Sequence, residues 1–131
     1  MVDLAKSQES YPLASISCTT YNHALFIRQC LDHLLAQKTN FPFEIIIHDD
    51  ASIDGTREIV AAYALKYPDI IFPYYQNENQ YSKGIRGLTS LYNHPRCRGQ
   101  YIAVCEGDDY WPDPLKLQRQ VDFLESHDDY V

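Results

Sequence analysis

Acidic side chains follow directly after two apolar runs of the sequence. Asp49 and Asp50 end one run, and Glu106, Asp108 and Asp109 end another. Carboxylates brought together repel one another unless a cation, hydrogen-bond donors or raised pKa values compensate. Mg²⁺ or Mn²⁺ is the natural compensator, because proteins hold these ions by one or two carboxylates together with nucleotide phosphates. The two clusters therefore predict a divalent-metal site that takes a phosphorylated ligand.

Each acidic cluster also has a structural explanation when taken alone. Asp49 and Asp50 would cap the loop and helix that follow them. Residues 106–109 would form a solvated turn before Pro112. The metal interpretation gains weight only if both clusters lie at strand ends of the same sheet, so the elements that position them decide between the two.

The apolar runs themselves read as four strands, at residues 13–19, 43–49, 70–75 and 101–106. Their starts lie roughly 30 residues apart, which is the length of a strand plus a crossover helix. We therefore expect an α/β fold with an open, mostly parallel βαβ sheet and helices on both faces. Right-handed crossovers would gather the carboxyl ends of the strands at one edge, where ligands of such sheets bind.

Helical patterns fill the segments between and after these strands. Apolar residues at positions 27, 31, 34 and 35 form one stripe that would pack on the sheet. A second helix is expected over about residues 56–66, with Asp54 as its N-cap and Pro68 beyond its end. A third is expected near residues 84–92. The last would begin at Asp113 and Pro114, since proline suits the first helical position.

Composition sets limits on the function. The chain has 131 residues, of which 45% are hydrophobic and 22% charged, as expected for one folded domain. Its net charge of −7 argues against nucleic acid as a partner, because such binders concentrate Lys and Arg on a face. We divide it into a polar N-terminal extension, residues 1–12, and an α/β domain, residues 13–131.

Cysteine and hydropathy patterns bear on the compartment. The four cysteines form no C-x-x-C pair and are read as free thiols, which suggests a reducing cytoplasm. No apolar run approaches the ~18 residues that span a bilayer, and the polar start lacks the apolar core of a signal peptide. We expect a cytoplasmic location, with peripheral membrane association open for a longer protein.

Three ordered blocks, SISCTTYN at residues 15–22, IIHDDASIDGT at residues 46–56 and the acidic stretch of residues 101–117, resemble the inverting family 2 glycosyltransferases with the GT-A fold. Residues 15–22, SISCTTYN, resemble the family's opening S-V-V-I-P-T-Y-N. Residues 46–56, IIHDDASIDGT, are similar to I-I-V-D-D-G-S-x-D-G-T. Residues 101–117 contain EGDDYWPDP, which is similar to the family's D-x-D-D-x-W-x-P block with glutamate first. Among the departures from the pattern, Thr19 replaces Pro, His48 replaces Val and Ala51 replaces Gly.

The resemblance assigns roles to particular positions. It places Thr20 and Asp50, with Asp49 adjacent, in the pocket for uracil or another base. Tyr21 and Asn22 would shape the loop beside that pocket, and Arg86 resembles a basic residue near the base or the diphosphate. Asp108 would be the main metal ligand. Glu106 occupies the other outer position of the metal motif, and its longer side chain reaches the ribose or a metal-bound water more readily.

The resemblance also implies a reaction. A sugar would pass from a nucleoside diphosphate donor, of the uridine type, to a hydroxyl of a saccharide, lipid or other acceptor, with Mg²⁺ or Mn²⁺ neutralising the leaving diphosphate. A base beyond residue 131 would deprotonate the acceptor, which gives inversion. The 131-residue chain is thus expected to bind nucleotide without transferring sugar. An apolar edge or face, left open for an acceptor segment, would favour self-association.

Two alternatives belong to other classes. A receiver-like signalling module also has acidic groups at strand ends, but it needs an acidic pair after its first strand, where Thr19 and Thr20 stand. A catalytically inactive nucleotide-binding relative is the second. The remaining polar residues read as structural: Trp111 as a rim or core anchor, Arg96 and Arg98 as exposed charges. The histidines lack metal-ligand spacing and read as surface or packing residues, His23, His33, His94 and His127.

Overall fold

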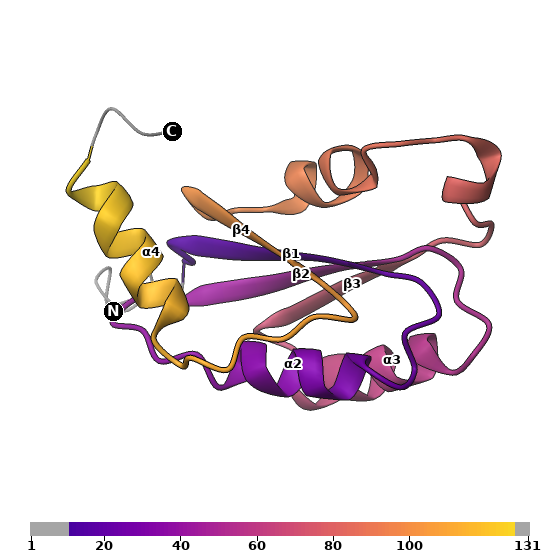
Figure 1. Cartoon of the computed structure of the whole chain (residues 1–131), viewed down its shortest axis with the longest axis horizontal. Helices are drawn as coiled ribbons and strands as arrows, with labels where there is room; N and C mark the ends of the chain where they lie inside the picture. Colours follow the sequence, from indigo (N-terminus) through magenta and orange to yellow (C-terminus); the bar gives the residue numbers. More distant parts are fainter. Residues whose placement is uncertain (1–10, 128–131) are drawn as a thin grey trace, which may run out of the picture.

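A four-stranded parallel sheet organises the computed structural model, which describes residues 11–127 (Figure 1). The strand order is β3-β2-β1-β4, and every neighbouring pair is parallel. The predicted open α/β sheet is confirmed. The strands are β1 (Ala14–Thr20), β2 (Phe43–Asp49), β3 (Ile71–Tyr75) and β4 (Tyr101–Glu106). β2 and β4 have the predicted bounds, β1 is shifted by one residue at both ends, and β3 begins one residue later than predicted. Most of the polar extension, residues 1–10, lies outside the described residues.

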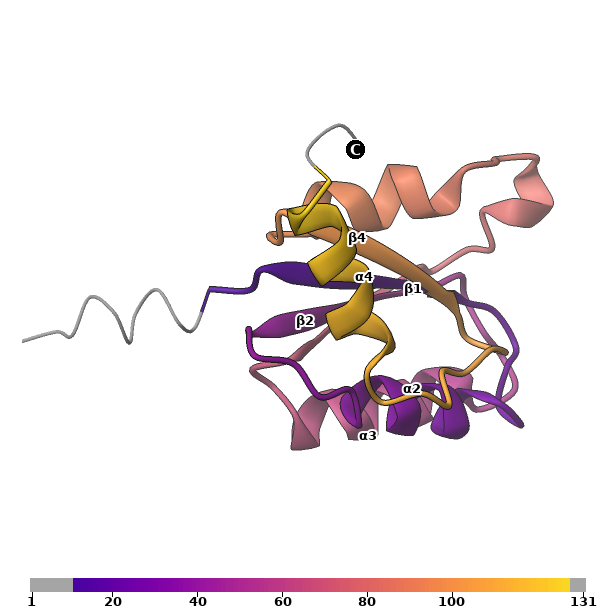
Figure 2. The same ribbon diagram turned by 60° about the vertical axis from the view of Figure 1, so that its left-hand side comes forward.

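Two helices cover one face of the sheet, α2 (Ile27–Leu35) and α3 (Thr56–Lys66) (Figures 1 and 2). The stripe of α2 predicted from periodicity is buried at Ile27, Leu31 and Leu34, whereas Leu35 is only half-buried. These side chains meet Ile16, Cys18, Ile45 and Ile47 of the two central strands in the main core.

The amino end of α3 differs in detail from the prediction. Its N-cap position is Gly55, whose φ of 104° suits glycine. The Asp54 carboxylate instead accepts hydrogen bonds from the backbone N–H of Thr56, at 3.0 Å, and from the Thr56 hydroxyl, at 2.6 Å. Asp54 thus satisfies a free N–H of the first turn from one residue before the cap.

Short helical turns, rather than an α-helix, cover the opposite face (Figure 2). The α-helix predicted near residues 84–92 is wrong: the segment forms η1 (Tyr81–Lys83), η2 (Thr89–Asn93) and η3 (His94–Arg96). Gly84 and Gly87 have φ of 86° and 67°, and left-handed residues interrupt a right-handed helix. The segment is fixed to the sheet by Asn93, whose side-chain amide donates to Ser17 Oγ at 3.0 Å and to the Cys18 carbonyl at 3.1 Å.

The amino end of the sheet is closed by an ion pair between the buried Glu44 and the exposed Arg98. Glu44, with 1% of its surface exposed, accepts hydrogen bonds from Ser15 Oγ at 2.6 Å, from the Arg98 backbone N–H at 2.7 Å and from Arg98 Nε at 2.9 Å. Arg98 is an exposed charge, as predicted, and its bonds to Glu44 also anchor the turn before β4. The next residue, Gly99, has no room for a side chain, because a Cβ there would lie 2.6 Å from the Ala14 backbone.

The last helix, α4 (Lys116–Glu125), begins two residues after the predicted start. The Asp113 carboxylate accepts the Leu115 N–H at 2.9 Å in the turn that precedes it. Leu117 and Val121 are buried as predicted, and Leu124 is half-buried. Trp111, only 5% exposed, is a core residue just before this helix.

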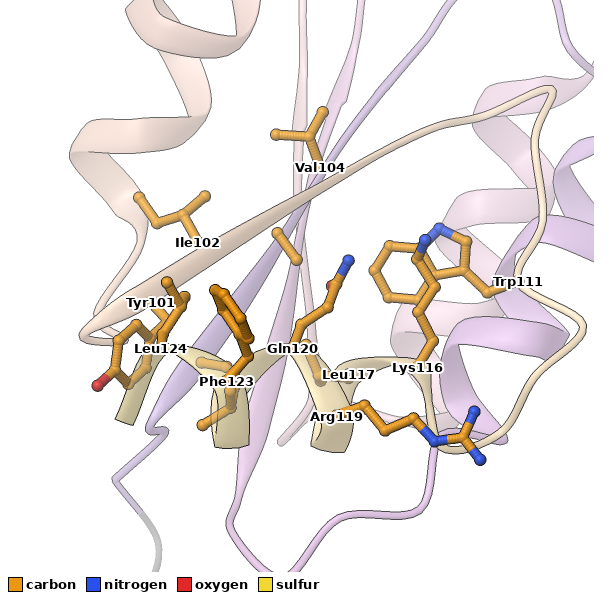
Figure 3. A pocket seen from close by; sticks show the side chains of 13 residues that line it. Tyr101, Ile102, Val104, Trp111, Lys116, Leu117, Arg119, Gln120, Phe123 and Leu124 are labelled. Atoms are coloured by element: carbon orange, nitrogen blue, oxygen red, sulfur yellow. The ribbon is translucent and has the colours of Figure 1, made fainter. Parts of the chain in front are cut away.

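An apolar groove of about 530 Å³ lies between β4 and α4 (Figure 3). The edge strand contributes Ile102 and Val104, which are 42% and 55% exposed, and the helix contributes Phe123, which is 48% exposed. Such exposure of neighbouring apolar side chains is the apolar edge expected from the sequence. No helix among residues 11–127 is long and apolar enough to cross a membrane.

Candidate functional site

The carboxyl ends of three strands meet at one edge of the sheet, as the parallel topology requires. In the register, Thr20 of β1 is paired with Asp49 of β2, and Thr19 is paired with Glu106 of β4. The loops that follow stay attached to β1, because Asp50 N–H donates to the Thr20 carbonyl at 3.0 Å and Gly107 N–H donates to the Thr19 carbonyl at 3.1 Å. The two acidic clusters therefore flank the same strand end.

Asp49, Ser52, Thr20 and Asn22, with the adjacent Asp50, form what we call the β2 corner. Asp49 is fully buried and its carboxylate accepts hydrogen bonds from the Ser52 hydroxyl and, at 3.3 Å, the Ser52 N–H. Burial raises the pKa of Asp49, and the hydrogen bonds from Ser52 oppose that shift. Asn22 links the two loops: its N–H donates to Ser52 Oγ and its side-chain carbonyl accepts the Ile53 N–H, both at 2.9 Å.

Asp50 holds the loop of residues 76–87 against the end of β2. One carboxylate oxygen accepts the Gln80 N–H at 2.7 Å and the other accepts the Tyr81 N–H at 3.1 Å. The Asn79 side-chain amide adds a bond to the Asp50 carbonyl at 2.9 Å. With only 1% of its surface exposed, Asp50 already has protein partners on both oxygens. It therefore has an anchoring role that the sequence did not indicate.

Two other residues predicted for the nucleotide lie at the surface of this region. Tyr21 is 42% exposed beside the β2 corner. Arg86 is exposed in the anchored loop, where its guanidinium stacks 4.0 Å from the centre of the Tyr81 ring and donates to the Tyr81 carbonyl at 3.1 Å. Since the Tyr81 N–H is bound to Asp50, this loop couples the exposed cation to the buried carboxylate.

Glu106, Asp108 and Asp109, with Gly107 and the neighbouring His23, form what we call the β4 corner. Its three acidic residues are exposed, and the Asp108 side chain is 52% exposed. Gly107 is buried against β1: a Cβ at this position would lie 2.4 Å from Thr20 Oγ1. Glycine therefore lets the acidic loop approach Thr20 closely.

The β4 corner suits a metal ion that binds together with phosphate oxygens. Within residues 11–127, no group of three His, Cys, Asp or Glu side chains could hold a metal ion by itself. Mg²⁺ and Mn²⁺ sites in nucleotide enzymes commonly need only one or two carboxylates, with phosphates completing the oxygen shell. Glu106 and Asp108 offer exposed carboxylates of this kind, so the donor set fits a metal–nucleotide complex.

His23 is a residue of this site that the sequence analysis treated as a surface or packing residue. Its Nδ1 lies 2.9 Å from Thr20 Oγ1, and its Nε2 lies 3.8 Å from Asp108 Oδ2. It thus stands between the β2 and β4 corners. Its place just after Tyr21 and Asn22, at the end of the first strand, was the available signal.

His48 is a second polar residue whose environment the sequence did not reveal. Its ring is fully buried and stacks on Tyr92, with ring centres 4.8 Å apart and planes 2° from parallel. Its Nε2 lies 3.2 Å from Gln76 Nε2, whereas its Nδ1 has no hydrogen-bond partner among the described residues. Burial lowers the pKa of His48 because it disfavours the charged ring.

Solved structures share this architecture. The mannosyltransferase PcManGT from Pyrobaculum calidifontis, in complex with GDP-Man and Mn²⁺, matches with a TM-score of 0.74 and 25% identity over 86% of this chain and 32% of its own. The S. aureus protein TarS in complex with UDP-GlcNAc matches with a TM-score of 0.73 and 25% identity over 88% of this chain and 32% of its own. The sheet is therefore that of GT-A glycosyltransferases.

Sequence relatives agree with the structural match. The uncharacterized protein Rv1520 of Mycobacterium tuberculosis is 44% identical over 114 residues, which are 86% of this chain and 32% of the relative. The putative glycosyltransferase EpsE of Bacillus subtilis is 35% identical over 123 residues, 92% of this chain and 41% of the relative. This chain thus spans about a third of the Mycobacterium protein. The model of the glycosyl transferase family 2 matches residues 15–131, and the chain belongs to that family.

Proposed function

We propose that this chain is the nucleotide-sugar-binding part of a metal-dependent, inverting glycosyltransferase that uses a uridine-type donor. The observation that carries the proposal is the meeting of two acidic loops at the carboxyl end of β1, set by the pairing of Thr20 with Asp49 and of Thr19 with Glu106. Ligands of open α/β sheets bind at this edge. The PcManGT complex with GDP-Man and Mn²⁺ and the TarS complex with UDP-GlcNAc support it.

The two corners divide the donor between them in this proposal. Thr20, Asp49 and Asp50 line the base side. Asp50 accepts a hydrogen bond from a base N–H through the carboxylate lone pairs that the N–H groups of Gln80 and Tyr81 do not use. Tyr21 and Asn22 border that side, and the exposed guanidinium of Arg86 reaches the base or the diphosphate. Asp108 and Glu106 form the metal side. Asp108 would be the main metal ligand, and Glu106 would contact the ribose or a metal-bound water.

The reaction follows from the charges at this edge. When bound, Mg²⁺ or Mn²⁺ supplies Lewis-acid stabilisation of the departing diphosphate. Asp108 would hold the metal ion beside the diphosphate. The base side fixes the nucleoside so that the anomeric carbon faces the acceptor hydroxyl. The acidic groups placed here all serve the donor, so the acceptor of saccharide, lipid or other hydroxyl type needs a further base. We expect the 131-residue chain to bind nucleotide without sugar transfer.

Two finer expectations remain part of the proposal. A cytoplasmic location is supported by the cysteines, all four of which are free. Self-association is supported by the apolar groove between β4 and α4, whose exposed side chains a second molecule would cover. Analytical ultracentrifugation over a concentration series tests it, and a monomer at all concentrations would contradict it.

Calorimetric titration of UDP into the purified chain tests the function. We expect tighter binding with Mn²⁺ or Mg²⁺ than with a chelator, because uncompensated carboxylates repel the diphosphate. Titration of GDP under the same conditions tests the preference for uridine. Equal UDP affinity with and without metal would contradict the metal-dependent function, and sugar transfer above a no-enzyme control would contradict the expected inactivity of this chain.

The alternatives separate on simple criteria. Membership of the glycosyltransferase family removes the receiver-like signalling module. A catalytically inactive nucleotide-binding relative would bind UDP and metal equally well. Transfer by a longer protein that contains this chain distinguishes the two, since an inactive relative gives no product.

A further inference from the structure

We propose that His23 is a positioning residue, which holds the carboxylate of Asp108 in the orientation that a metal–nucleotide complex requires. This inference rests on the proposed function of the β4 corner. Its basis is the alignment of three side chains from β1 to the acidic loop: Thr20 Oγ1 lies 2.9 Å from His23 Nδ1, and His23 Nε2 lies 3.8 Å from Asp108 Oδ2.

The contact between Thr20 Oγ1 and Nδ1 is compatible with a tautomer that turns an imidazole N–H toward Asp108. When the Thr20 hydroxyl donates to Nδ1, the neutral imidazole carries its proton on Nε2, which faces Asp108. The distance of 3.8 Å is longer than a hydrogen bond, but the Asp108 side chain is half-exposed and adjusts by rotation about its own torsions. In this tautomer the Thr20 hydroxyl holds the ring through Nδ1, and the Nε2–H points toward the Asp108 carboxylate.

The backbone of His23 is held firmly by hydrogen bonds on both sides of the residue. The His23 N–H donates to Thr56 Oγ1 at 2.9 Å, and the His23 carbonyl accepts from the N–H groups of Phe26 and Ile27 at 2.9 and 2.8 Å as the chain enters α2. Gly107 packs so closely that an added Cβ would lie 2.8 Å from Nδ1. The backbone of His23 and the Nδ1 side of its ring are therefore constrained by the protein, whereas the Asp108 side chain is half-exposed.

This asymmetry gives His23 a defined role. Carboxylates that bind metals are usually themselves held by hydrogen bonds, and loss of such an outer partner lowers metal affinity about 10–100-fold. The neighbouring carboxylate in this loop, that of Asp109, accepts the Tyr110 N–H at 2.8 Å and so stabilises the turn. Of the described residues, His23 is the one whose side chain is within ion-pair distance of Asp108.

The test measures Mn²⁺ binding by electron paramagnetic resonance, with the 131-residue chain and saturating UDP. We expect His23→Ala to weaken Mn²⁺ binding about 10-fold. His23→Gln should recover part of this loss, because its amide supplies an N–H donor. UDP affinity without metal should fall less than Mn²⁺ affinity in both variants. His94→Ala, at an exposed position in η3, is the matched control and should bind Mn²⁺ normally.

The outcomes separate this inference from the proposed function. If the original chain shows no Mn²⁺-dependent UDP binding, the proposed function itself fails. If the original chain binds and His23→Ala and His23→Gln both bind Mn²⁺ equally well, only the positioning role is overturned. Equal losses of metal-free and metal-dependent binding in both variants would also overturn it, since they indicate a structural residue. Thermal melting of His23→Gln confirms that the comparison is made on folded protein.

Discussion

The β2 and β4 corners contain the same kind of side chain in opposite environments. At the β2 corner, Asp49 and Asp50 are 0% and 1% exposed, and backbone or hydroxyl donors occupy both carboxylates. At the β4 corner, Glu106 and Asp108 are exposed, and the His23 ring lies within ion-pair distance of Asp108. The carboxylates of the β2 corner are held by donors of the protein, whereas Glu106 and Asp108 of the β4 corner face solvent.

This difference separates two uses of aspartate at a strand end. A buried carboxylate with several donors fixes loops and preforms a surface, and its loss lowers the free energy of unfolding. An exposed carboxylate contributes little to stability, so its presence among like charges calls for another explanation. The comparison therefore predicts that identical Asp→Asn changes give opposite phenotypes at the two corners.

The largest effect is expected for Asp108→Asn at the β4 corner. Metal-dependent UDP binding should weaken about 100-fold or more, because loss of even an outer partner of a metal ligand costs about 10–100-fold. The free energy of unfolding should change by no more than about 0.5 kcal/mol, as for most surface substitutions. Calorimetry and urea denaturation measure the two quantities. Normal binding, or an unfolded variant, would mean that Asp108 is a structural residue.

Asp50→Asn at the β2 corner should lower the free energy of unfolding, which Asp108→Asn should leave nearly unchanged. The new amide group faces the N–H of Gln80 or Tyr81, and one unmatched buried donor costs about 1–3 kcal/mol of stability. Amide exchange should become faster across residues 76–87, and affinity should change differently for UDP and GDP. Asp69→Asn, at an exposed loop position, is the control and should leave all three readouts unchanged. Unaltered stability would remove the distinction between the corners.

The buried His48 beside the β2 corner should make stability sensitive to mild acid. Burial lowers its pKa, so the folded state keeps the ring neutral while the unfolded state takes up a proton below about pH 6.5. Stability is therefore lost as pH falls from 6.5 toward the lowered pKa, by at most about 1.4 kcal/mol per pH unit. His48→Phe, which keeps a ring for stacking, should lose less stability between pH 7.5 and 5.5. Parallel curves from denaturant titrations would contradict this assignment.

The smallest expected change is a gain in stability from Ala51→Gly at the β2 corner. Ala51 has a φ of 65°, and a left-handed conformation costs a non-glycine residue about 1–2 kcal/mol. Glycine removes this cost but adds about 0.5–1 kcal/mol of backbone entropy, so the net gain should be about 0.5 kcal/mol. Ala61→Gly, on the exposed side of α3, is the opposite control and should lower stability by about 1 kcal/mol. Thermal unfolding compares the two.

The sequence was sufficient for the parts of the fold that depend on local pattern. Short apolar runs predicted the four strands to within a residue at either end, and the spacing of Ile27, Leu31 and Leu34 predicted the buried side of α2. The helix expected near residues 84–92 failed because Gly84 and Gly87 adopt left-handed conformations, which periodicity does not register. Glycine there permits turns that an apolar pattern alone cannot distinguish from a helix.

The site was predictable as a meeting of strand ends, but not in its internal contacts. Parallel register brings Thr20, Asp49 and Glu106 to one edge whatever their side chains do. The bonds from Gln80 and Tyr81 to Asp50 cross 30 and 31 positions of sequence, and no local signal announces them. His23 was missed for the same reason, since its partner Asp108 comes from a different strand end.

The strand order has a consequence for the order in which the chain folds. β1 lies between β2 and β4, so one of its edges pairs with residues 43–49 and the other with residues 101–106. During synthesis the first pairing is available well before the second, and one edge of β1 stays unpaired while residues 50–100 emerge. Unpaired strand edges are where intermediates associate wrongly. Slow translation of residues 50–100 should therefore lengthen the interval in which this protein depends on chaperones.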